Sequence, residues 1–144
     1  MTNRTKDQEA KVAVARRLAD EVFSKGDMRA LDEIIPENYV NHNIPVPGIP
    51  GTKAGFKQLV LATRRAFPDV HVSVKDVVTE GDFVVFRDVV RATSRDEFFG
   101  VPATGQPLDW TEIHFLRIVD GKIVEHWTNF DQARILTQLG VLPS

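Results

Sequence analysis

The stretch 108–130, LDWTEIHFLRIVDGKIVEHWTNF, decides which fold this chain can adopt. At its centre is Asp120-Gly121, a dipeptide that supplies the positive φ angles of a two-residue hairpin turn. The residues on either side therefore predict two paired antiparallel strands, over 108–119 and 122–130. A short helix follows, because Asp131 is a suitable N-terminal cap and Gly140 a suitable stop.

The preceding residues change from a helical to an alternating hydrophobic period along the chain. Helices are predicted over 7–25, 27–35 and 52–67, a short strand over 39–42, and further strands over 70–79 and 83–93. The proline-rich segment 44–51, IPVPGIPG, is predicted to be a loop over the mouth of a cavity. Helices followed by antiparallel strands predict an α+β fold, with a curved, mostly antiparallel sheet around three N-terminal helices.

Composition limits the classes of protein to which the chain can belong. At 144 residues, 42% hydrophobic and 26% charged, residues 1–144 are predicted to form one globular domain. A net charge of −2 provides no basic surface for nucleic acid, and the lack of cysteine excludes thiolate nucleophiles. The N-terminus lacks the apolar core of a signal peptide, and no apolar run could span a membrane. We therefore expect a cytoplasmic protein without a membrane partner.

Several motifs resemble those of the NTF2-like superfamily and, within it, the SnoaL-like polyketide (ester) cyclases. They are Tyr39-Val40-Asn41-His42, Ala66-Phe67-Pro68-Asp69, Phe99-Gly100-Val101-Pro102-x-Thr104-Gly105, RIVDGKI at 117–123, and Gln138-Leu139-Gly140. The resemblance extends from about Asp7 to the end of the chain and implies an NTF2-like cone with an internal cavity. It also implies an intramolecular aldol reaction on a polyketide ester without metal or organic cofactor, using an Asp as acid–base and a nearby His.

The resemblance places the family's histidine on His114 but its aspartate on Thr128. A threonine hydroxyl cannot abstract a proton at neutral pH, so the family mechanism does not transfer unchanged. Two carboxylates are candidates for the missing acid–base group. Asp88 is in phase with apolar residues of its strand, where burial would raise its pKa. Glu112 lies two residues from His114 on the same strand and is the second candidate catalytic residue.

The resemblance also implies that the His114 face of the hairpin lines the cavity. Strand alternation then gives a predicted set of substrate-binding residues on that face: Trp110, Leu116, His126, Thr128 and Phe130. Asn41 is predicted to donate a hydrogen bond to a substrate oxygen near the cavity mouth. The spacing of the histidines matches no metal motif, so no metal site is expected.

These residues favour a cofactor-independent acid–base enzyme, an aldol cyclase, isomerase or related lyase, acting on an apolar, carbonyl-bearing small molecule such as a polyketide. One alternative is a ligand-binding dimer without catalysis, which the threonine at 128 supports. The other is a limonene-type epoxide hydrolase, although the Arg-x-Asp pairing of those relatives is absent here.

The opposite face of the hairpin predicts self-association. Its outward set, Ile113, Phe115, Ile123 and Trp127, is apolar, and a contiguous exposed apolar patch usually marks an interface. We expect a homodimer formed through this outer face of the sheet.

Overall fold

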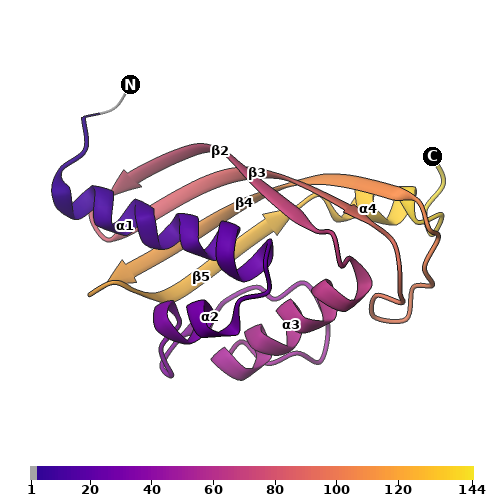
Figure 1. The fold of residues 1–144 in the computed structure, drawn as a ribbon, viewed down its shortest axis with the longest axis horizontal. Helices are drawn as coiled ribbons and strands as arrows, with labels where there is room; N and C mark the ends of the chain where they lie inside the picture. The colour runs from indigo at the N-terminus through magenta and orange to yellow at the C-terminus, as the bar shows by residue number, and fades with distance from the viewer. Residues whose placement is uncertain (1–2) are drawn as a thin grey trace.

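Each of the four α-helices begins next to a residue whose side chain caps it. Within residues 3–144, the part of the chain that the structure describes, a computed structural model gives α1 (Lys6–Arg17), η1 (Leu18–Phe23), α2 (Met28–Ile34), α3 (Lys53–Ala66) and α4 (Gln132–Gln138). Thr5 forms a capping box with Gln8, while Asp27, Thr52 and Asp131 each accept a hydrogen bond from a backbone N–H of the first turn. Helices α1, α2 and α3 lie over one face of the sheet, and α4 lies near one end of it (Figure 1).

The first predicted helix is not a single α-helix. Residues 18–23 form the π-helix η1, in which Ser24 N–H bonds to the carbonyl of Ala19. Leu18, Ala19 and Val22 are buried there. The wider turn also brings Phe23 to the wall of the cavity described below. Short π-helical segments within α-helices are uncommon and frequently occur at functional sites.

The strands form one five-stranded sheet in the order β1-β5-β4-β3-β2, to which the second half of the chain contributes all but β1 and the start of β2. Its strands are β1 (Val40–Asn41), β2 (His71–Glu80), β3 (Phe83–Thr93), β4 (Pro107–Val119) and β5 (Lys122–Phe130). Only the pairing of β1 with β5 is parallel, so the predicted α+β fold with a mostly antiparallel sheet is confirmed. The turn between β4 and β5 has φ values of 50° at Asp120 and 74° at Gly121, which agree with the predicted hairpin turn.

A β-bulge in β5 overturns one prediction for the hairpin. Arg117 pairs with Glu125 but Ile118 pairs with Ile123, so Val124 is an extra residue without a partner. Because one extra residue reverses the faces of a strand, Ile123 points into the core and is fully buried. The prediction that Ile123 faces outward with Ile113 and Phe115 was therefore wrong.

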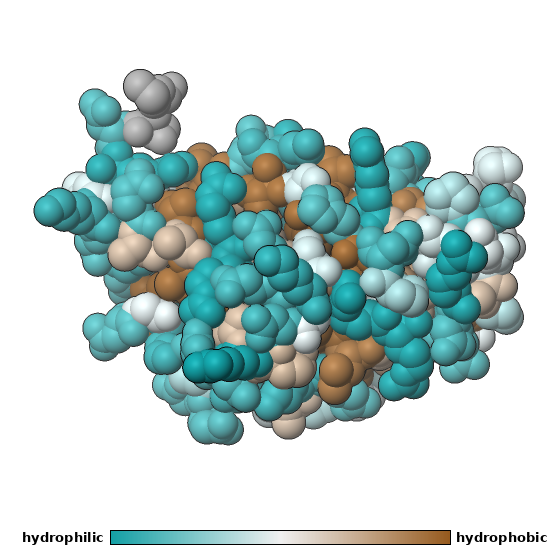
Figure 2. Space-filling model, in the orientation of Figure 1, coloured by the Kyte–Doolittle hydropathy of each residue, from teal (hydrophilic) through white to brown (hydrophobic). Residues whose placement is uncertain are grey.

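The core lies between the inner face of the sheet and the helices. Val84, Phe86 and Leu116 of the sheet are fully or almost fully buried, as are Leu18 and Phe56 of the helical layer. Hydrophilic residues cover most of the helical side of the molecule (Figure 2). None of the helices in the described chain is long and apolar enough to cross a membrane.

Candidate active site

A cavity of about 260 Å³ lies between the inner face of the sheet, α3, α4 and two loops. Its volume is close to the lower end of the range for small-molecule sites, roughly 300–1,000 Å³. One loop contributes residues 45–47 and the other contributes Phe98, Phe99 and Val101, so the predicted loop 44–51 does reach the cavity. Most of the wall is apolar, and its larger side chains include Phe23, Phe56, Leu59, Phe67, Phe98, Trp110 and Phe130.

Most of the polar groups of the cavity wall belong to residues that the sequence singles out. Asn41 from β1, Glu112 and His114 from β4, and His126 and Thr128 from β5 all line the cavity. Two predicted residues lie elsewhere: Asp88 is buried behind His114, and Leu116 belongs to the core below the cavity wall. The prediction that Leu116 lines the cavity was therefore wrong.

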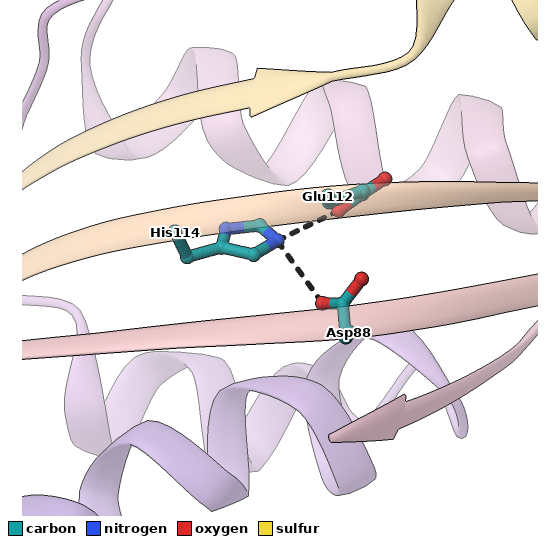
Figure 3. A group of neighbouring side chains, drawn as sticks. All are labelled: Asp88, Glu112 and His114. Atoms are coloured by element: carbon teal, nitrogen blue, oxygen red, sulfur yellow. Dashed lines mark hydrogen bonds and ion pairs between the residues drawn. The ribbon is translucent and has the colours of Figure 1, made fainter. Parts of the chain in front are cut away.

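One ring nitrogen of His114, Nε2, faces two carboxylates (Figure 3). Its Nε2 is 2.7 Å from Oε2 of Glu112 and 3.4 Å from Oδ2 of Asp88. The two carboxylates lie close together because Asp88 of β3 is the direct cross-strand partner of Glu112 of β4. The other oxygen of Glu112 accepts a hydrogen bond of 2.7 Å from the indole N–H of Trp110. The ring of His114 stacks on Phe86 at a centroid distance of 4.6 Å.

Asp88 is a buried carboxylate without a hydrogen bond. It is 0% exposed, and neither of its oxygens has a hydrogen-bond partner among residues 3–144. The single proton on Nε2 of His114 is shared with Glu112, which is the nearer acceptor. Burial raises the pKa of Asp88, the charge on Glu112 raises it further, and His114 partly opposes the shift. Burial therefore disfavours the charged form of Asp88, which lies behind the cavity wall.

The ionisation of Glu112 and His114 is coupled. Burial alone would raise the pKa of Glu112, but the hydrogen bond and charge of His114, with the hydrogen bond from Trp110, hold its pKa below the ordinary value. Burial alone would lower the pKa of His114, but the close contact of its Nε2 with Asp88, the hydrogen bond that Nε2 donates to Glu112, and the two negative charges raise it to about 9. The two carboxylates thus favour the imidazolium form of His114.

This raised pKa predicts a specific dependence of stability on pH. The folded state binds the His114 proton more tightly than the unfolded chain does, and this difference stabilises the fold. The stabilisation is fully present below pH 6.5 and is lost as the pH rises through about 9. The free energy of unfolding should fall by on the order of 3 kcal/mol over that interval. Urea unfolding of the wild type and of His114→Gln at several pH values between 6 and 10 measures this change in the free energy of unfolding. Parallel pH profiles for the two proteins would contradict the prediction.

The other side of His114 faces a second polar chain. Nδ1 of His114 is 2.9 Å from Nε2 of His126, and Nδ1 of His126 is 2.8 Å from the hydroxyl of Tyr39. The Tyr39 hydroxyl accepts a hydrogen bond of 3.1 Å from Nδ2 of Asn41. The hydroxyl of Thr128 lies 2.8 Å from Nε2 of His126 and 3.3 Å from Nδ1 of His114. The position where the resemblance places an aspartate thus holds a hydroxyl that bridges both rings.

Asn41 and His42 point to opposite faces of the sheet. Asn41 is 8% exposed and lines the cavity, which agrees with its predicted inward direction. His42 stacks on Trp127 at a centroid distance of 4.5 Å, and its Nε2 is 2.7 Å from Oε2 of Glu125. His42 therefore belongs to the outer face and takes no part in the cavity.

Sequence reasoning missed Tyr39 as a member of the site. This residue is the single tyrosine of the chain, and it is 2% exposed with its hydroxyl on His126. A signal was present, since Tyr39 lies two positions before Asn41 and strand alternation places such residues on the same face.

The carboxylates and His114 also form a possible cation site. One oxygen each of Asp88 and Glu112, together with one nitrogen of His114, lie within 4.8 Å of one another. The sequence predicts no metal, because these ligands come from two strands rather than from a short motif. Their spacing makes the metal content of the protein a necessary control in any assay.

A mostly apolar cavity with acid–base groups at one place on its wall has the features of a small-molecule site and the groups needed for proton transfer. The chain belongs to the SnoaL-like polyketide cyclase family, whose family model matches residues 13–139. The resemblance found in its sequence motifs is therefore confirmed.

Three relatives illustrate the match. The chain is 31% identical to nogalonic acid methyl ester cyclase of Streptomyces nogalater over 122 residues, which cover 82% of this chain and 89% of that protein. It is 29% identical to the aklanonic acid methyl ester cyclase DnrD of Streptomyces peucetius, covering 90% of each. The crystal structure of IdmH from Streptomyces antibioticus, a proposed polyketide cyclase, matches with a TM-score of 0.76 at 38% identity, covering 91% of this chain and 99% of that one.

Proposed function

We propose that the protein is a cofactor-independent cyclase that catalyses an intramolecular aldol reaction on an apolar, carbonyl-bearing ester of polyketide type. The observation that carries this proposal is the Glu112–His114 pair, which lies at 2.7 Å on the wall of a mostly apolar cavity. Relatives named as methyl ester cyclases support the substrate class.

In this mechanism Glu112 takes the first proton. Its carboxylate removes a proton from the carbon next to a substrate carbonyl, and the proton is held within the Glu112–His114 pair. The enolate carbon then forms a bond to a second carbonyl carbon of the same molecule, and the resulting alkoxide takes the proton back. Atoms and charge balance without a redox partner, because the product is an isomer of the substrate. A carboxylate can act as such a base without a strongly raised pKa when the site stabilises the enolate.

The groups around the pair supply that stabilisation. The amide of Asn41 has a second N–H besides the one given to Tyr39, and the hydroxyl of Thr128 lies at the same cavity wall. Either can donate to an oxygen on which negative charge develops, which is usually a large contribution to catalysis of this kind. In this assignment Asp88 remains behind His114 and supports its positive charge.

Proton exchange with solvent tests the proposal even when ring closure is slow. The protein is incubated in D₂O with nogalonic acid methyl ester and aklanonic acid methyl ester, and deuterium uptake and product are followed by mass spectrometry and NMR. We expect deuterium next to a carbonyl and a cyclised isomer of unchanged heavy-atom composition. Binding without exchange would overturn catalysis and support the ligand-binding alternative. Loss of exchange in EDTA would assign a cation to Asp88, Glu112 and His114 and overturn the metal-free mechanism.

We further propose that two copies of the chain associate through the outer face of the sheet. Ile113 is 49% exposed and Phe115 is 41% exposed on this face, although β4 lies in the middle of the sheet. The Phe115 ring lies 5.1 Å from that of Phe83 and 5.6 Å from that of Trp127, so the apolar patch extends over three strands. A two-fold dimer would remove this patch from water.

A charge at Ile113 should separate the two copies. Ile113→Glu is expected to convert a dimer to a monomer with little change within each fold, since this side chain is half exposed in the single chain. Leu61→Glu is the matched control, because Leu61 is also 49% exposed but lies on α3. Light scattering at micromolar concentration measures the mass of both variants. A monomeric wild type would contradict the proposed dimer.

A further inference from the structure

Asp88 lacks the partner that a buried carboxylate needs. Its side chain is fully buried, and neither oxygen has a hydrogen bond within the described part of the chain. Buried charged groups are usually paired or bound to a metal ion. Oδ2 of Asp88 faces Nε2 of His114 at 3.4 Å, and this nitrogen also faces Oε2 of Glu112 (Figure 3). The unpartnered carboxylate therefore points to a place where two further atoms of metal-binding type meet.

The three atoms have the chemistry and nearly the spacing of a zinc site. Zinc binds imidazole nitrogen and carboxylate oxygen at about 2.0–2.2 Å in tetrahedral geometry, so its ligand atoms lie roughly 3.3 Å apart. Nε2 of His114 and Oδ2 of Asp88 already have this spacing, at 3.4 Å. Nε2 and Oε2 of Glu112 are closer, at 2.7 Å, because a hydrogen bond joins them. A shift of the Glu112 carboxylate by roughly 0.6 Å would complete the tetrahedral spacing.

The surroundings suit the ligands that a metal would use. Oε1 of Glu112 accepts the indole N–H of Trp110, and a bond of this kind orients a ligating carboxylate. Nδ1 of His114 lies 2.9 Å from Nε2 of His126, which can accept the proton that Nδ1 carries when Nε2 binds a metal. Two carboxylates, a neutral imidazole and Zn²⁺ have no net charge, which is the least costly arrangement for a buried site.

The cavity provides the route by which an ion can enter. Glu112 and His114 line the cavity, whereas Asp88 lies behind them. The Glu112 side chain is 17% exposed, so an ion that arrives from the cavity meets this carboxylate first. Three protein ligands leave one position of a tetrahedral ion for a water molecule, as in many zinc sites that are open to solvent.

We propose that Asp88, Glu112 and His114 form a zinc-binding site, and that bound zinc inhibits the enzyme. The ion takes the place of the proton between Nε2 of His114 and Oε2 of Glu112, and this proton leaves to solvent. Its bond to Oε2 occupies the lone pair with which Glu112 removes a proton from carbon. The binding site is independent of the proposed function, whereas the inhibition rests on it.

Zinc affinity tests the site without any need for turnover. The protein is freed of metal with EDTA, the EDTA is removed, and zinc is titrated in competition with a chromogenic chelator. We expect one zinc ion per chain, bound at least about tenfold more weakly by Asp88→Asn, since even groups that only support a ligand contribute this much. Asp76→Asn is the matched control, because Asp76 is exposed on β2 and bonds to Arg87. Equal affinities in the two variants would overturn the site.

Cobalt gives a second measurement that needs no substitution. Co²⁺ replaces zinc in sites of this kind, and its visible absorption distinguishes a four-coordinate ion from the six-coordinate ion of water. We expect the intense bands of the four-coordinate ion in the unmodified protein, and their loss when zinc is added. The spectrum of the hydrated ion would overturn the site even if Asp88→Asn does not fold.

Inhibition is measured separately, by deuterium exchange into the substrate. Saturating zinc should slow the exchange by roughly 10²-fold or more, the loss expected when a positioned base is blocked, and EDTA should restore it. Unchanged exchange with zinc bound, or exchange that requires zinc, would overturn the inhibition. Zinc binding that depends on Asp88, in a protein that exchanges neither with zinc nor without it, would support the site and overturn the proposed function.

Discussion

Replacing Glu112 by glutamine is expected to slow deuterium exchange and ring closure by roughly 10²–10⁴-fold, the usual contribution of a positioned acid–base group. The amide has nearly the shape of the carboxylate and can still accept from the indole of Trp110, but it cannot take a proton from carbon. The rate of exchange in D₂O at saturating substrate measures the effect. Glu80→Gln is the control, since Glu80 is exposed at the end of β2 and should leave the rate unchanged.

A second substitution tests whether a carboxylate at position 128, next to Nδ1 of His114, can replace Glu112, which lies next to Nε2. In the resemblance the acidic group falls at position 128, where Thr128 Oγ1 lies 3.3 Å from Nδ1 of His114. The double variant Glu112→Gln/Thr128→Asp should therefore exchange at least about tenfold faster than Glu112→Gln alone. This gain is smaller than the full contribution of a positioned acid–base group. A Glu112→Gln protein that exchanges as fast as the wild type would remove Glu112 from the mechanism.

Replacing Gly55 by alanine adds a single methyl group and is expected to cause a large loss of stability. A Cβ at Gly55 would lie 1.9 Å from the carbonyl oxygen of Pro50 and 2.9 Å from its carbon, and both are backbone atoms. Alanine is ordinarily better than glycine in a helix by about 1 kcal/mol. Here the clash should reverse that gain and lower the free energy of unfolding by roughly 2 kcal/mol or more.

Chemical unfolding measures this loss, with Gln58→Ala as the control. Gln58 is exposed on the same helix, so alanine there reports only helix propensity. Moving Pro50 would also disturb Asn41, because the carbonyl of Gly51 accepts the backbone N–H of Asn41 at 3.0 Å. Ligand affinity should therefore fall together with stability. A Gly55→Ala protein as stable as Gln58→Ala would show that the close approach of loop and helix does not exist in solution.

The parts of the fold that follow from local chemistry were predictable. The turn at Asp120-Gly121 and the helix caps at Asp27 and Asp131 depend on residues within a few positions of one another, and the structure places them as predicted. Alternation along β4 likewise placed Glu112 and His114 on one face. Local signals of this kind survive folding because neighbouring residues reinforce them.

The parts that depend on distant contacts were not predictable from one sequence. The bulge at Val124 turns Ile123 inward, and only the pairing of β5 with β4 reveals it. Tyr39 and His126 are 87 positions apart in the sequence, and the parallel pairing of β1 with β5 brings them together. The π-helical turn that ends at Phe23 has no glycine or proline in 18–23, so no local signal in the sequence predicts it.

The two sides of the cavity wall come from different layers of the molecule. Glu112, His114 and His126 all come from the sheet, whereas α3, α4 and two loops supply much of the apolar wall. Changes of size at helix or loop positions such as Leu59 or Leu136 can therefore alter which molecule fits without moving the reacting groups. Such modularity allows substrate range and reaction chemistry to diverge separately during evolution, and it makes the helical layer the natural target for engineering new specificity.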